Sequence, residues 1–145
     1  MATLQELLGG EKRNAVIDDS LRVLDQEVDS KGGLSGIAIK TAYKVVKGIS
    51  PDFLHKTVNF LLDDFLKALD PLYQEAVQKG INPKQHLVSN PGRVADALLA
   101  ITDARAARAQ NQMVKKTYEK LRDGAKKHVE AAVPRLGEMF ARHVS

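Results

Sequence analysis

The chain of 145 residues contains no cysteine and no tryptophan, and only 5% of its residues are aromatic. The absence of cysteine excludes disulfide bonds, thiolate catalysis and metal or iron–sulfur sites built on cysteine ligands. A chain without cysteine is consistent with a reducing compartment. Because aromatic side chains are so few, the core must consist mainly of Leu, Val, Ile and Ala, which suits packed helices.

Long hydrophobic runs are also missing. The longest apolar runs span only a few residues, whereas a membrane-spanning helix needs roughly 20. The N-terminal sequence MATLQE has no basic segment followed by an apolar stretch, as a secretory signal peptide would. We therefore expect a soluble, cytoplasmic protein with no transmembrane segment.

Four of the five prolines directly follow a residue that commonly caps helices. Ser, Asp and Asn side chains accept hydrogen bonds from the free amides of a first helical turn. Proline suits the first helical position because its nitrogen carries no hydrogen. The four pairs are Ser50-Pro51, Asp70-Pro71, Asn82-Pro83 and Asn90-Pro91. Each pair predicts the start of a helix, although the second could instead kink a helix that is already formed.

Apolar residues at helical spacing predict the other helices. Thr3 and Glu6 form a capping-box pattern, which predicts a short first helix ending at Gly9-Gly10. The later predicted helices cover residues 11–31, 34–47, 51–69, 70–80, a short segment from 83, 91–109 and 114–140. Pro134 should bend the last of these helices.

These patterns predict an all-α fold. We expect a single-domain multi-helix bundle over residues 1–145, with six to eight helical segments and no sheet. No segment alternates apolar and polar residues as a strand would, and no hairpin signal such as Asn-Gly is present. The helix over residues 53–69 has the widest apolar stripe, so it should lie near the centre of the bundle.

Basic residues are concentrated in the second half of the chain. Residues 1–72 hold 9 Lys/Arg and 11 Asp/Glu, a net charge of −2, whereas residues 73–145 hold 13 and 7, a net charge of +6. In the helix over residues 34–47, three lysines share the face opposite the side expected to be buried, which carries Ile37, Ala38, Ala42, Val45 and Val46. A candidate surface for an anion or a partner consists of Lys40, Lys44, Lys47, Lys115, Lys116, Lys120, Lys126 and Lys127. The alternative is a basic face that is only solvated.

No motif indicates catalysis, a cofactor or a metal. The glycine-rich segment at residues 32–36 precedes a helix but lacks the spacing of a phosphate-binding loop, so it predicts a tight turn between helices. The four histidines form no pair at helical spacing. The basic segment 105–127 has one aromatic residue, Tyr118, which its spacing assigns to the apolar stripe, so we do not expect nucleic-acid binding. We name no catalytic, cofactor-binding or metal-ligating residue, and we favour a protein that is not an enzyme.

Three segments resemble the motifs of a family of small bacterial proteins of unknown function. They are residues 33–47 (GLSGIAIKTAYKVVK), 94–105 (VADALLAITDAR) and 118–132, which contains YEKLR and AKKHVEAA. The resemblance spans most of the chain and is weakest over residues 80–90. It implies one small helical domain and supplies no activity, catalytic residue or cofactor.

Two functions of different kinds remain. The first is an interaction module that binds another protein or a second copy of itself. The second is a carrier of an anionic or apolar small molecule or lipid, which would use the basic face together with a groove between helices. The aromatic residues Phe53, Phe60 and Phe65 are the expected walls of that groove.

Overall fold

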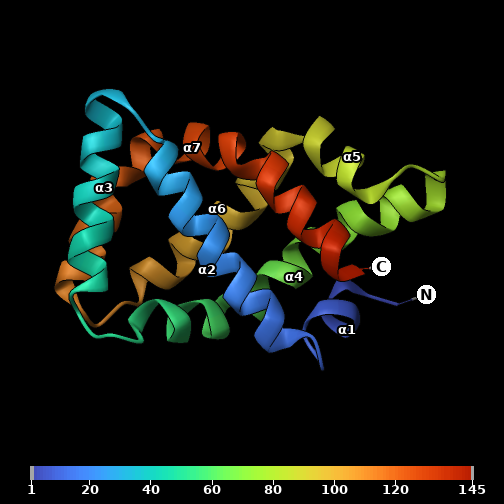
Figure 1. Cartoon of the computed structure of the whole chain (residues 1–145), viewed down its shortest axis with the longest axis horizontal. Coiled ribbons are helices and arrows are strands. Elements are labelled where there is room, and N and C mark those ends of the chain that lie inside the picture. The colour runs from blue at the N-terminus through green and yellow to red at the C-terminus, as the bar shows by residue number, and fades with distance from the viewer. Residues whose placement is uncertain (1, 145) are drawn as a thin grey trace.

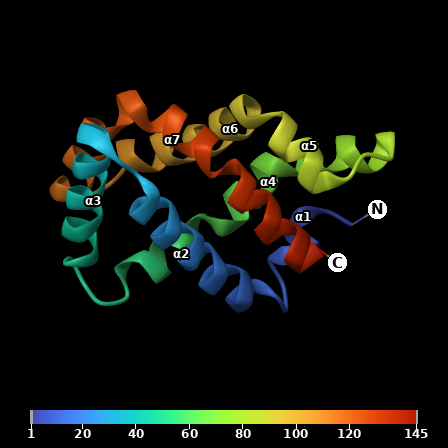
Figure 2. The ribbon, with the colours of Figure 1, turned by 45° about the horizontal axis from the view of Figure 1, so that its top comes forward.

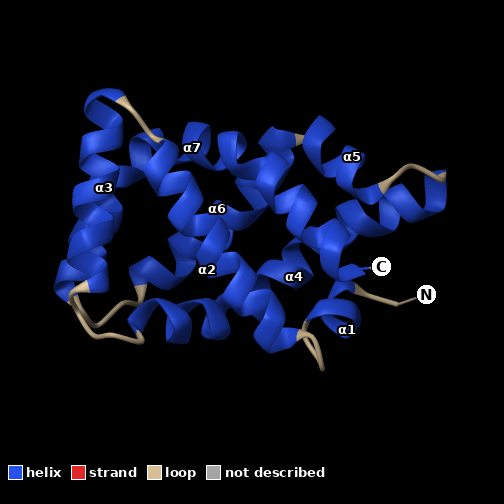
Figure 3. Ribbon diagram, viewed as in Figure 1, coloured by secondary structure: helices blue, strands red, loops and turns tan. Residues whose placement is uncertain are grey.

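The computed structural model describes residues 2–144, and over that range the chain forms seven α-helices and no strand (Figures 1 and 3). The helices are α1 (Leu4–Leu8), α2 (Arg13–Ser30), α3 (Gly33–Lys47), α4 (Phe53–Lys79), α5 (Pro83–Ser89), α6 (Pro91–Ala107) and α7 (Gln112–Val144). The predicted all-α bundle with six to eight helical segments is confirmed.

Two long helices organise the bundle. α4 has 27 residues and α7 has 33, and each packs against the same five helices: α1, α2, α3, α5 and α6. The central position predicted for residues 53–69 agrees with these contacts. α4 and α7 are not packed closely against each other. They instead face each other across the middle of the bundle.

The sequence signals at three helix starts are correct. The Thr3 hydroxyl accepts a hydrogen bond from the amide of Glu6 at 3.2 Å, which caps α1. The Asn82 side chain accepts one from the amide of Gln85 at 3.2 Å, which caps α5. Asn90 precedes Pro91 at the start of α6, but its amide nitrogen donates to the carbonyl of His86 at 2.8 Å and makes no cap. Local side-chain chemistry therefore determines the starts of α1 and α5.

Two proline pairs do not start helices. Ser50-Pro51 lies in the turn before α4, which begins at Phe53. Asp70-Pro71 lies inside α4, which continues through it to Lys79. The Asp70 carboxylate instead accepts a hydrogen bond at 2.9 Å from the amide of Leu4, the first residue of α1. Asp70 thus satisfies a free amide of another helix, which the local pattern could not indicate.

α7 is a single helix through both Gly124 and Pro134. Figures 1 and 2 show that it changes direction along its length: its first part lies beside α3 and its last part runs alongside α2. A change of direction is the expected effect of a proline, which removes one backbone hydrogen bond and crowds the preceding turn.

The end of α7 is fastened to α2 by Asp19, whose side chain is buried. Arg142 donates to both Asp19 carboxylate oxygens, with its Nη2 atom 3.0 and 2.8 Å from Oδ1 and Oδ2, and His143 Nε2 lies 2.9 Å from Oδ2. Burial acts to raise the pKa of Asp19, but the hydrogen bonds from Arg142 and His143 hold it below its ordinary value of 3.8. Asp19 therefore stays charged and paired.

α3 stands at one end of the molecule, where it has neighbours on one side only (Figure 1). In the described part of the chain, Gly36 is the one buried residue of α3. It packs so closely against the end of α2 that a Cβ atom there would lie 2.6 Å from the carbonyl carbon of Lys31. Gly33 has φ +68°, a conformation that favours glycine. As predicted, these glycines allow a tight turn between α2 and α3.

The predicted buried side of α3 is partly wrong. Ile37 is 63% exposed and Val45 is 40% exposed, whereas Ile39, Tyr43 and Val46 are half-buried. The helix is rotated from the expected orientation because it contacts α2, α4 and α7 on one side and nothing covers the other. Helical spacing identifies which residues share a face but not which face is covered.

Candidate functional site

A cavity of about 360 Å³ lies between the two long helices. Its walls are almost wholly carbon atoms, and it is partly open to solvent. The apolar lining residues come from five helices: Val23, Leu24 and Val28 of α2, Ile39 of α3, Val58, Leu62, Phe65, Leu66 and Leu69 of α4, Leu98 of α6, and Val129, Ala132, Leu136, Met139 and Phe140 of α7. The arrangement follows from the separation of α4 and α7, since both direct an apolar face into the same space.

These wall residues lie where helical periodicity predicts an inward face. Leu24 and Val28 are four residues apart on α2, and Leu62, Leu66 and Leu69 follow the same spacing on α4. Many of them, including Val23, Leu62 and Leu66, also belong to the hydrophobic core. The cavity is therefore bounded by core residues, although it is partly open to solvent.

Carbon walls that face solvent are unfavourable. The space is partly open, so water can enter it, but the walls offer that water almost no hydrogen-bond partners. Removing apolar surface from water contributes roughly 25 cal/mol per Å². An apolar guest would cover these walls and displace the water.

The cavity meets a groove of about 280 Å³ that runs between α3 and α7. The two spaces share three lining residues, Ile39, His128 and Val129. Lys120 and Ala38 line the groove on opposite sides. The groove therefore connects the apolar interior with the surface beside α3.

Charged groups surround this junction but are paired with one another. Glu27 is buried, and its carboxylate accepts hydrogen bonds from Lys31 Nζ at 3.2 Å and from Arg135. Lys31 also donates to the backbone carbonyl of His128 at 3.4 Å. Burial and the nearby Lys31 charge lower the pKa of His128 below its ordinary value of 6.5. The imidazole is therefore neutral at neutral pH, and the cavity opening carries no unpaired buried charge.

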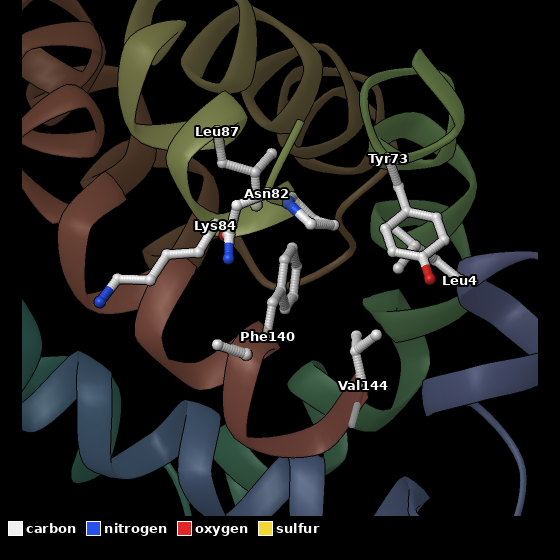
Figure 4. Close-up of a pocket in the computed structure, with 9 residues that line it drawn as sticks. Leu4, Tyr73, Asn82, Lys84, Leu87, Phe140 and Val144 are labelled. Carbon is white, nitrogen blue, oxygen red and sulfur yellow. The ribbon is translucent and has the colours of Figure 1, made fainter. Parts of the chain in front are cut away.

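A second, smaller pocket of about 210 Å³ lies between α1, α4, α5 and α7 (Figure 4). Figure 4 shows the Phe140 ring in the middle of this pocket, with Leu87 and Lys84 on one side and Tyr73 on the other. Phe140 also lines the larger cavity. Its ring therefore forms part of the wall between the two spaces.

The structure divides the eight predicted lysines into groups. Lys40, Lys44 and Lys47 lie on α3, and Lys120 lines the groove beside them. Lys116 and Lys127 share a face with Lys120, at spacings of four and seven residues. The other two predicted positions are Lys115 and Lys126 on the side of α7 toward α6, where Lys126 pairs with Asp96 at 3.0 Å. Three of the eight lysines thus lie on α3 and Lys120 lies beside it, while Lys116 and Lys127 continue the Lys120 face along α7.

The aromatic groove is only partly where the sequence placed it. Phe65 lines the cavity. Phe60 is 63% exposed, and the guanidinium of Arg105 lies 4.4 Å from the centre of its ring. Phe53 is half-buried outside the lining. The cavity wall consists mainly of aliphatic residues from α2, α4 and α7. The one sequence signal that these residues line a site is their position in the apolar stripes of their helices.

Two other polar clusters hold helices together. Arg122 donates to both oxygens of Asp103, at 2.8 and 3.1 Å, and lowers the pKa of this carboxyl group, as does a hydrogen bond from Tyr118. Tyr118 also contacts Thr102 at 2.6 Å, so it is part of a polar network and not of the apolar stripe alone. Arg93 and His86 bind Glu75 and lower its pKa to about 2. Among residues 2–144, no three His, Asp or Glu side chains gather as a metal site would require.

These features define a class of protein: an all-α bundle with an apolar cavity between its long helices and a basic rim. A family model described as a family of unknown function, DUF6918, matches residues 4–144, and the chain belongs to this family. The family membership inferred from the three motif segments is therefore confirmed at the level of a family of unknown function. Searches of curated proteins and of solved structures found no match.

Proposed function

We propose that this protein binds an apolar molecule, or the apolar chain of an amphipathic anion, in the cavity between α4 and α7. The observation that supports the proposal is a space of about 360 Å³ with carbon walls inside the core. This volume lies at the lower end of the range for small-molecule sites, roughly 300–1,000 Å³. The lysines around α3 would attract an anionic head group at the opening.

The proposal concerns a carrier and not an enzyme. The polar side chains that line the cavity are those of Ser20, Glu27, Lys31 and His128. Glu27 binds Lys31 and Arg135, and the Ser20 hydroxyl donates to the backbone carbonyl of Val16 at 2.7 Å. We also propose a cytoplasmic location, to which the cysteine-free composition is suited. Within the described chain, no helix has the length and apolar character needed to cross a bilayer.

Two measurements test the proposal. Native mass spectrometry of the freshly purified protein should detect an additional mass that is released on denaturation. After removal of that ligand, cis-parinaric acid, a fluorescent long-chain fatty acid, should bind saturably at one molecule per chain, because its emission rises in an apolar site. Dodecanoic acid should displace it. A protein without an additional mass that leaves the fluorescence of cis-parinaric acid unchanged would contradict the proposal.

The interaction-module hypothesis would use a different part of the molecule. The outer face of α3 exposes large apolar residues, which are typical of interaction surfaces. This face lies outside the cavity, so the two hypotheses can be tested separately.

A further inference from the structure

The outer face of α3 is apolar and uncovered. Leu34 is 88% exposed, and Ile37 and Val45 are exposed on the same side of the helix. The spacing of these residues, three and then eight positions, places them in one strip along the helix. Leu34 and Ile37 lie in the first turns, just after the glycine turn that ends α2. The helix that carries the strip, α3, lies at one end of the molecule (Figure 1).

Three lysines line one edge of this apolar strip. Lys40, Lys44 and Lys47 recur at spacings of four and three residues, and the segment 33–47 contains no acidic residue. Lys47 lies 3.8 Å from Asp25 and 4.9 Å from the centre of the Tyr43 ring. Lys40 and Lys44 are exposed and form no ion pair within residues 2–144. This edge faces α2.

A second row of lysines lies along the other edge. Ala38 and Val45 of α3 line a groove with Lys120 of α7. Lys116 and Lys127 share a face of α7 with Lys120. The apolar strip of α3 thus has the lysines of its own helix on one edge and Lys120 of α7 on the other.

We propose that this end of the molecule docks on an anionic lipid bilayer. Helices that lie at a membrane surface insert apolar side chains and direct lysines to the head groups, and each lysine near an anionic surface adds to the attraction. A second copy of the chain is a poor occupant, because a self-association of this face would bring lysines against lysines. Single protruding side chains such as Leu34 suit insertion between lipids better than contact with a flat protein surface.

The proposal rests on exposed residues and not on the cavity, so it holds or fails independently of the proposed function. Membrane docking would also bear on ligand transfer, because the groove beside α3 meets the cavity at Ile39, His128 and Val129. Docking through α3 would place the opening of that groove at the lipid surface. An apolar ligand could then pass between bilayer and cavity without crossing water.

The test is flotation with vesicles of phosphatidylcholine alone or of an equimolar mixture with phosphatidylglycerol. The full chain should float with the anionic vesicles at low ionic strength and much less at high ionic strength, because salt screens surface charges. The double substitutions Leu34→Ser with Ile37→Ser, and Lys40→Glu with Lys44→Glu, should each reduce the bound fraction at least tenfold. All four residues are exposed, so circular dichroism and the melting temperature should remain as in the wild type.

A matched control changes one lysine and one exposed apolar residue at the opposite end of the molecule, Lys79→Glu with Ile81→Ser. This variant should float like the wild type. Equal loss in the control and the α3 variants would overturn the proposal, as would equal binding to neutral vesicles. Light scattering that shows a dimer abolished by Leu34→Ser with Ile37→Ser would instead assign the face to a second copy. Leu34 and Ile37 do not line the cavity, so normal binding of cis-parinaric acid by Leu34→Ser with Ile37→Ser is expected and separates this test from that of the cavity.

Discussion

Replacing Ala132 by phenylalanine should abolish ligand binding and stabilise the protein at the same time. Ala132 is a small residue in the cavity wall on α7, so a phenyl ring there occupies the space that the ligand would use. The affinity for cis-parinaric acid should fall more than tenfold. The free energy of unfolding without ligand should rise by about 1–2 kcal/mol, because apolar surface that lacked contacts is buried.

The neighbouring Ala131 provides the control, because it is exposed on the outside of α7. Ala131→Phe adds the same ring but should change neither affinity nor stability appreciably. If Ala132→Phe were strongly destabilised and still bound the fatty acid, the ring would have been forced into a packed core. That outcome would mean that the cavity is filled by side chains and that the ligand binds elsewhere.

Replacing Asp19 by asparagine should destabilise the protein by about 3 kcal/mol, since the buried carboxylate makes charge-assisted hydrogen bonds to Arg142 and His143 that the amide cannot replace. Arg142 and His143, both near the C-terminal end of α7, would lose their common partner on α2. Calorimetry should record a fall in melting temperature of about 10 °C. The adjacent exposed residue provides the control: Asp18→Asn should melt like the wild type.

The Asp19 effect should depend on pH in a defined direction. The carboxyl group has a lower pKa in the folded protein than its ordinary value of 3.8. Its stabilisation is therefore complete above pH 3.8 and is lost as the pH falls through the lowered pKa. The difference in stability between wild type and Asp19→Asn should shrink as the pH falls below 3.8. A difference that grew below pH 3.8 would exclude the carboxylate pairing as its cause.

Local sequence signals predicted local structure well in this protein. Thr3 and Asn82 cap their helices as expected, because the hydrogen bond joins atoms only three residues apart. Asp70 shows the limit of such signals. Its carboxylate binds the amide of Leu4, 66 residues away, and nothing in the neighbouring sequence indicates that partner. With Asp70 bound to another helix, the Asp70-Pro71 pair starts no new helix, and α4 continues through Pro71.

The sequence predicted which apolar residues face the interior, but it did not predict that they enclose a cavity. Leu24, Val129 and Leu136 belong to the apolar stripes of the helices predicted over residues 11–31 and 114–140, and all three line the cavity. The apolar side chains of two facing helices either interdigitate or leave a space, and which of these occurs depends on the distance between the helices. The periodicity of the sequence gives no information on that distance. The same reason explains α3, where Ile37 belongs to an apolar stripe and yet remains exposed because no helix covers it.

The central claim is that the space between α4 and α7 holds an apolar ligand. A crystal structure of the protein with a terminally brominated dodecanoic acid tests it most directly, because anomalous scattering locates the bromine atom. We expect a bromine peak among the carbon walls formed by Leu62, Leu98 and Ala132, with the carboxylate toward the lysines around α3. Side chains that fill this space, with bromine absent or bound only at the surface, would contradict it.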